Sequence, residues 1–76
     1  MSSTFRTPDF EIIENLTSRE SEVLHLVAQG ATNETIAEQL VITIGTVKSH
    51  INHILRKLNA HNRTEVVARA RRLGLV

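Results

Sequence analysis

The chain has 76 residues and no cysteine, so it has room for one small domain that helix packing, rather than disulfides or thiolate-bound metal, must stabilise. Its N-terminus lacks the apolar run of a signal peptide, and no stretch approaches the about eighteen apolar residues of a membrane span. We therefore expect a cytoplasmic protein with no membrane contact. The net charge is only +1, but residues 1–40 carry seven acids and two bases, whereas residues 41–76 carry seven bases and one acid.

Residues 1–15 show no sustained periodicity and contain the turn signal Thr7-Pro8-Asp9, which favours an N-terminal tail or linker. Thr17 followed by Glu20 forms a capping-box pattern at the start of a first helix, and Gly30 is placed to end it. The apolar residues between them share one helical face: Val23, Leu24, Val27 and Ala28. The pattern predicts a helix over about 18–29.

A second and a third helix follow, with Thr32 and Thr43 as their N-caps. The second is short, and its apolar face consists of Ile36, Ala37, Leu40 and Val41. The third, over about 44–58, has an apolar stripe that must face a core: Ile44, Val47, Ile51, Ile54, Leu55 and Leu58. Its opposite face is polar and has no carboxylate: Gly45, Lys48, Ser49, Asn52, His53 and Arg56.

The fourth helix is expected from about Arg63 to Leu73, where Asn62 and Glu65 form another capping-box pattern and Gly74 takes the left-handed position after the last turn. Four helical segments with short connections and no strand-like alternation predict an all-α, bundle-like domain over residues 16–76.

The second and third helices have the spacing of a helix-turn-helix, in which the second member of the pair enters the DNA major groove. Ala37 is small enough for the two helices to approach closely, although Val41 stands where the turn usually has glycine. The excess of bases after residue 40 suits a polyanionic partner, but it fits a solvated basic face equally well.

Many positions in order and spacing resemble the LuxR-type DNA-binding domain of bacterial transcription regulators, from Leu16 to Leu75. The resemblance is carried by Leu16-Thr17-Ser18-Arg19-Glu20-Ser21-Glu22-Val23-Leu24, Gly30, Asn33, Ile36-Ala37, Leu40, Ile42, Thr46-Val47-Lys48-Ser49-His50, Ile54, Lys57-Leu58 and Leu73-Gly74-Leu75. The chain departs from the family pattern at Thr35, where glutamate is usual, at Thr43, where serine is common, and at Ala60, where valine is common.

The resemblance implies a four-helix domain that binds partly palindromic promoter sites as a dimer and recruits or blocks RNA polymerase. Lys48, Ser49 and Asn52 fall on the outward positions that the family uses to face base edges, which suits their donor and acceptor chemistry. A second set is expected to contact phosphates without reading sequence: Thr32, Asn33, Thr46, His53, Arg56 and Lys57. For the threonines in that set, helix capping is the alternative role.

The fourth helix is the element through which family members commonly pair, and its apolar residues Val66, Val67 and Ala70 are the expected dimer contacts. The alternative is burial in the monomer's own core, and pairing through so small a surface should be weak. Glu20 and Arg63 match positions that we interpret as structural, as an ion pair between the first and fourth helices. Arg69, Arg71 and Arg72 fit a solvated face, flanking DNA or polymerase equally well.

Other function classes find less support in the sequence. His50 and His53 are three residues apart, but no carboxylate or cysteine joins them, so no metal site or cofactor is expected, and His50 is expected at the edge of the core. No nucleophile with an identifiable base and no glycine-rich phosphate loop is present, so the chain is not expected to be an enzyme. The remaining alternative is a small helical module that binds an acidic protein partner.

Overall fold

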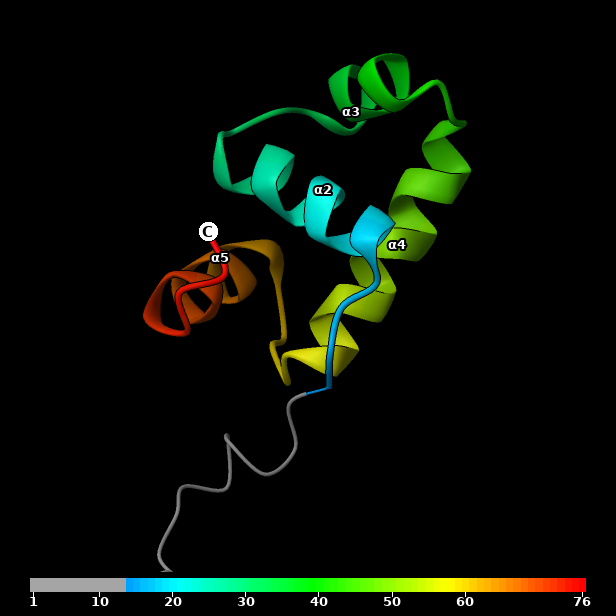
Figure 1. Cartoon of the computed structure of the whole chain (residues 1–76). Coiled ribbons are helices and arrows are strands. Elements are labelled where there is room, and N and C mark those ends of the chain that lie inside the picture. The colour runs from blue at the N-terminus through cyan, green and yellow to red at the C-terminus, as the bar shows by residue number, and fades with distance from the viewer. Residues whose placement is uncertain (1–13) are drawn as a thin grey trace, which may run out of the picture.

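The computed structural model describes residues 14–76, which form four helices and no strand (Figure 1). The helices are α2 (Ser18–Ala28), α3 (Asn33–Leu40), α4 (Ile44–Lys57) and α5 (Arg63–Arg72). They confirm the predicted all-α architecture, and the bounds predicted for α2, α4 and α5 each lie within one residue of those observed. Most of the predicted tail lies outside the described residues. None of the four helices is long and apolar enough to cross a bilayer.

Each helix starts at the polar residue that the sequence predicted as its cap. The capping box of α2 is complete, because the Thr17 hydroxyl accepts from the Glu20 N–H and a Glu20 carboxylate oxygen accepts from the Thr17 N–H. The predicted box at α5 is wrong in one half. Asn62 accepts from the Glu65 N–H, but the Glu65 carboxylate turns to the backbone N–H and ring of His61. Those bonds from His61 lower the pKa of Glu65.

The predicted helix ends are also present. Gly30 and Gly74 have φ angles of 89° and 74°, the left-handed conformation that glycine adopts without steric cost. The turn at Gly74 closes with hydrogen bonds from its own N–H to the Arg71 carbonyl and from the Leu75 N–H to the Ala70 carbonyl.

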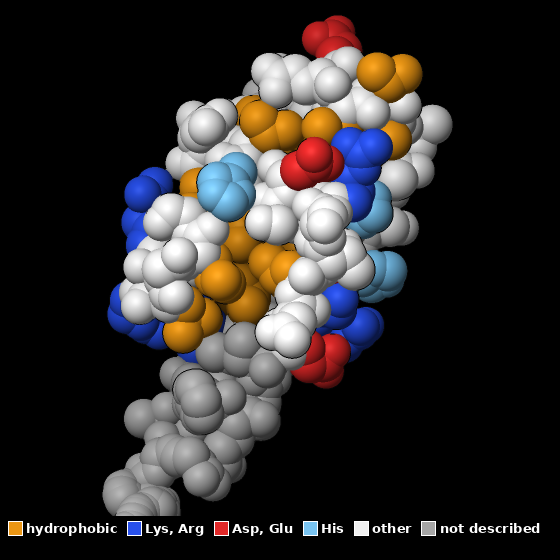
Figure 2. All heavy atoms as spheres, in the orientation of Figure 1, with side chains coloured by type: hydrophobic (Ala, Val, Ile, Leu, Met, Phe, Trp, Pro, Cys, Tyr) orange, Lys and Arg blue, Asp and Glu red, His pale blue; other side chains and the backbone are white. Residues whose placement is uncertain are grey.

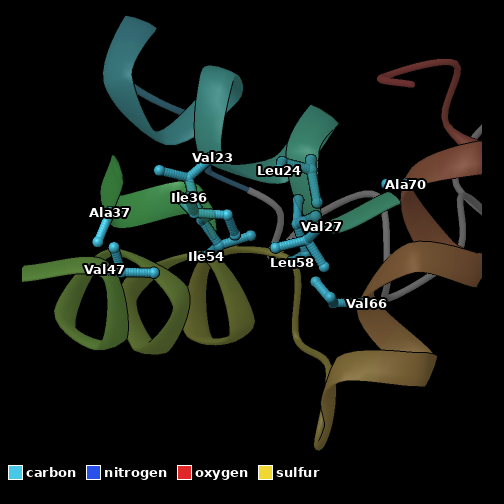
Figure 3. Packing of buried hydrophobic residues seen from close by; sticks show 10 residues of the cluster. All are labelled: Val23, Leu24, Val27, Ile36, Ala37, Val47, Ile54, Leu58, Val66 and Ala70. Atoms are coloured by element: carbon cyan, nitrogen blue, oxygen red, sulfur yellow. The ribbon is translucent and has the colours of Figure 1, made fainter. Parts of the chain in front are cut away.

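The core lies between α2, α4 and α5, with α3 covering the start of α4 (Figure 3). Val27, Leu58 and Val66 meet where α2, α4 and α5 come together. The ten buried apolar residues are Val23, Leu24, Val27, Ile36, Ala37, Val47, Ile54, Leu58, Val66 and Ala70. Leu16, ahead of α2, packs against this cluster, and the Glu14 N–H donates to the Lys57 carbonyl. This tie places the last residues of the predicted tail against the end of α4.

One residue of the predicted apolar stripe on α4 does not reach the core. Ile44 is 40% exposed, because it stands in the first turn of α4, beyond the edge of the packed cluster. The rest of the stripe is buried or partly buried against the cluster: Val47, Ile51, Ile54, Leu55 and Leu58.

Candidate nucleic-acid interface

The α3 and α4 helices form a compact pair. Ala37 of α3 and Val47 of α4, which are 8% and 0% exposed, face each other in Figure 3. Between the helices, Val41 adopts a left-handed conformation with a φ of 57°, and the Ile42 N–H donates to the Ala37 carbonyl. This is the tight turn of a helix-turn-helix, made here with valine in place of glycine.

The polar face of α4 is open to solvent as the sequence predicted. All six residues of that face are exposed: Gly45, Lys48, Ser49, Asn52, His53 and Arg56. Figure 2 shows basic and histidine side chains along the right margin, where α4 lies in Figure 1. Because no acid occurs in the sequence between Glu38 and Glu65, this face carries positive charge and hydrogen-bonding groups without a carboxylate of its own.

The starts of α3 and α4 border the same shallow hollow. Its lining residues come from the loop after α2, the start of α3, the first turns of α4 and the start of α5: Gly30, Ala31, Thr32, Asn33, Glu34, Ile44, Lys48 and Arg63. The exposed cap hydroxyls pair with threonines one turn later. Thr32 accepts from the Thr35 N–H and donates to the Thr35 hydroxyl, and the hydroxyls of Thr43 and Thr46 lie 2.9 Å apart.

Arg63 ties α5 to the start of α3, and not to Glu20 as the sequence interpretation proposed. Its Nη1 donates to Asn33 Oδ1 over 2.8 Å, and its Nη2 donates to the Ala31 carbonyl over 2.6 Å. The predicted ion pair between Glu20 and Arg63 is therefore wrong. No local sequence pattern predicts the observed contacts, because the partners lie 30 and 32 residues before Arg63 in the chain.

Glu20 instead joins α2 to the end of α4. The Lys57 ammonium lies 2.8 Å from Glu20 Oε1, with side chains 15% and 5% exposed, and His53 Nδ1 lies 3.8 Å from Glu20 Oε2. Burial alone would raise the pKa of the Glu20 carboxyl, but the hydrogen bonds from Lys57 and Thr17 and the Lys57 charge outweigh it, so the pKa lies below its usual value. The Lys57 ammonium is thus already paired with a carboxylate of the same domain, which argues against its predicted phosphate contact.

Two of the three predicted dimer contacts on α5 are inaccessible. Val66 and Ala70 are 2% and 0% exposed and belong to the monomer's own core. The spacing that puts them on one face of α5 is the same for a core and for a dimer surface, so the sequence could not separate the two roles. Val67 is half-buried and borders a second hollow with Thr64, Ala68 and Arg71.

The remaining histidines and arginines have varied surroundings. His50 is half-buried, as expected for the edge of the core. Within residues 14–76 no three histidine, aspartate or glutamate side chains are grouped to hold a metal ion. The Arg69 side chain is only 12% exposed and lies 3.9 Å from Glu65. Arg71 and Arg72 are exposed, and Arg71 Nη2 donates to the Ala28 carbonyl at the end of α2 over 3.3 Å.

Comparison with known protein families decides the class of this helix-turn-helix. The family model described as bacterial regulatory proteins of the luxR family matches residues 14–70. The chain belongs to the LuxR family. Its helix-turn-helix is therefore a DNA-binding domain of transcription regulators, which are not enzymes, as the sequence predicted.

Individual LuxR-family relatives support the same assignment. The chain is 52% identical over 63 residues to the transcriptional regulatory protein LiaR of Bacillus subtilis, which covers 83% of this chain and 30% of LiaR. It is 46% identical over 66 residues to the response regulator protein VraR of Staphylococcus aureus, which covers 87% of this chain and 32% of VraR. The chain thus spans about a third of the length of these relatives.

A solved response-regulator structure shares the fold. The crystal structure of the response regulator ChrA of a heme-sensing two-component system superposes with a TM-score of 0.79 at 40% identity, over 83% of this chain and 31% of ChrA. The matched part of ChrA shares the all-α arrangement described above. DNA binding follows from the LuxR-family assignment, and the alternative of an acidic protein partner has no comparable support.

Proposed function

We propose that this LuxR-family domain binds promoter DNA as a dimer on a partly palindromic site, with α4 in the major groove. The observation that carries the proposal is the exposed, carboxylate-free face of α4, held by the buried opposite face against α2 and α3. The helix has 14 residues, and its diameter of about 10 to 12 Å with side chains matches the width of about 12 Å of the major groove.

Three residues in the first turns of α4 are assigned to base reading. Lys48 donates to the O6 and N7 acceptors of guanine, and Asn52, one turn later, pairs with the N6 and N7 edge of adenine. Ser49 lies between them and serves either as a donor or as an acceptor. All three side chains are exposed, so no internal contact must break before they reach a base edge.

Phosphate contacts are assigned to residues around this face. Thr32 and Asn33 lie at the start of α3, and Thr46 lies in the first turn of α4, where N–H groups and the positive end of the helix dipole favour an anion. His53 and Arg56 lie farther along the exposed side of α4. Lys57 is left out because Glu20 holds its ammonium.

Dimerisation is proposed through the outer side of α5, with Val67 as the remaining apolar contact. The neighbouring Ala68 is exposed and small, whereas Arg71 and Arg72 add positive charge to the same helix end. Two such helices repel each other, so pairing should be weak without DNA. Because the chain spans about a third of the length of its relatives, it is proposed to be the DNA-binding part of a longer response regulator. That regulator is proposed to act in the cytoplasm and to contact RNA polymerase.

The test is a fluorescence anisotropy titration with a duplex selected from a random-sequence library by the wild-type chain, and with a scrambled duplex. Lys48→Ala should weaken binding to the selected duplex at least tenfold and reduce the ratio of the affinities for the selected and the scrambled duplex. Arg19→Ala removes the same charge from the exposed start of α2, outside the proposed contacts, and is the matched control. Salt-insensitive binding, or equal losses for both variants, contradicts groove reading by α4.

A further inference from the structure

Asn33 is the first residue of α3, and its contact with Arg63 determines which way its side-chain amide is oriented. The guanidinium of Arg63 has five N–H donors and no acceptor, so the amide atom 2.8 Å from Nη1 must be the oxygen. The amide nitrogen then points away from Arg63, and within residues 14–76 it has no hydrogen-bond partner. Its two N–H donors are therefore left for a group outside the domain.

Arg63 is itself held in place while it makes this contact. It is the first residue of α5, directly after the cap Asn62, and its second nitrogen donates to the Ala31 carbonyl just before α3. The two bonds form a fork that fixes the loop and the Asn33 rotamer together. Both residues are half-buried, so the fork is shielded in part from competing water.

The surroundings of the amide favour an anion. Lys48 and Arg63 line the hollow beside Asn33, and Glu34 supplies the single carboxylate of that lining. A cation at the start of a helix opposes the helix dipole, so the placement of Arg63 costs some stability in the unbound domain.

We propose that Arg63 is the positioning residue for the phosphate contact of Asn33. It accomplishes this by holding the amide oxygen, so that the amide nitrogen presents two donors to the DNA backbone. Arg63 acts through Asn33 and does not itself neutralise a phosphate. The inference rests on the proposed DNA-binding function and deepens the assignment of Asn33 within it.

The two ways in which Arg63 could assist DNA binding differ in salt dependence. A cation that neutralises a phosphate releases counterions, so its loss lowers the slope of log affinity against log salt by about 0.9, whereas the loss of a neutral amide donor leaves the slope unchanged. Anisotropy titrations with the selected duplex at several salt concentrations should be made for Asn33→Ala, Arg63→Met and the double variant. Arg19→Met, on the exposed start of α2 and outside every proposed contact, is the charge-matched control.

Each single variant is expected to weaken binding about fivefold with an unchanged slope, and the double variant to bind no more weakly than either one. Three results would each overturn the inference: losses of affinity that multiply in the double variant, a slope lowered by about 0.9 in Arg63→Met but not in Arg19→Met, or unchanged affinity in Asn33→Ala. If the wild-type chain shows no salt-sensitive, sequence-selective binding, it is the proposed function that fails.

A second variant keeps the test decisive if Arg63→Met does not fold. Asn33→Asp retains an oxygen for Arg63, and so keeps the fork, but it has no N–H to offer a phosphate. Its midpoint of urea unfolding should be at least that of the wild type, while its DNA affinity falls more than fivefold. A stable Asn33→Asp variant with wild-type affinity would refute the donor role of the amide and with it the positioning role of Arg63.

Discussion

The four helices differ in how their first turns are satisfied. At α2 and α5 the third helical residue is an acid, Glu20 or Glu65, whose carboxylate accepts hydrogen bonds from within the domain. At α3 and α4 the same position is a threonine, Thr35 or Thr46, which pairs only with the hydroxyl of its own cap. A carboxylate thus accepts backbone N–H groups at the starts of α2 and α5, and no carboxylate does so at the starts of α3 and α4.

The same division appears at the helix ends. The left-handed residue that follows α2 and α5 is glycine, at Gly30 and Gly74, whereas Val41 follows α3 and Asn59 follows α4. A β-branched residue in this conformation is strained, and asparagine is the side chain that tolerates it best. The local sequence therefore favours α2 and α5 more than α3 and α4 at both ends.

This difference indicates which interactions stabilise each pair of helices. Short helices are marginal on their own, so α3 depends on packing, in which Ile36 and Ala37 are buried against α2 and α4. Its first turn, and that of α4, keep hydrogen-bonding groups at the surface for a ligand. Changes that add or remove an acid at a helix start should separate stability from DNA binding.

The largest effect is expected where an internal acid is removed. Glu20→Ala deletes one half of the α2 capping box and leaves the mostly buried Lys57 ammonium without its carboxylate. We expect a loss of about 2 to 3 kcal/mol in the free energy of unfolding, measured by urea denaturation. Glu22→Ala breaks only the exposed pair with Arg19 and is the control, with an expected change below about 0.5 kcal/mol. Equal losses would show that Glu20 has no special structural role.

The converse change adds an acid to α4. Thr46→Glu supplies a carboxylate that can accept from the Thr43 N–H, as Glu20 does at α2, and should raise the free energy of unfolding by about 0.5 kcal/mol. It also places a negative charge where a phosphate is proposed, so DNA affinity should fall about tenfold or more. Thr46→Gln can close the same box without the charge and should retain more affinity. A loss of stability in both variants would remove the contrast between the two kinds of helix start.

Lowering the pH should destabilise the wild-type domain more than a variant that lacks the Glu20 carboxylate. The pKa of Glu20 is lowered in the folded chain, so its contribution to stability is present above the usual value of 4.5 and is lost as pH falls through the folded value. The free energy of unfolding should therefore decrease more steeply below about pH 4.5 in the wild type than in Glu20→Gln. Glu65, whose pKa is also lowered, is present in both proteins and cancels in the comparison. Parallel acid titrations by circular dichroism would contradict the assignment.

Local signals were sufficient for the helices and insufficient for the contacts between them. Thr17, Thr32, Thr43 and Asn62 cap their helices because a cap and its bond lie within four residues. Lys57 meets Glu20 across 37 residues, and such a pairing depends on how the helices cross. Outward and inward faces of α4 follow from periodicity, but periodicity could not tell whether the apolar residues of α5 belong to the core or to a dimer.

The smallest effect is expected at the turn between α3 and α4. Val41 is 88% exposed with a φ of 57°, so Val41→Gly relieves backbone strain and sacrifices little packing. The gain is partly cancelled because glycine loses more backbone entropy on folding, which leaves an expected increase of about 0.5 kcal/mol in the free energy of unfolding. Asn59→Gly, with nearly the same φ of 56°, is the matched control and should gain less, because asparagine already tolerates the conformation. If both variants gain equally, the strain at Val41 is not a property of its branched side chain, and the ends of the helix-turn-helix pair are alike in this respect.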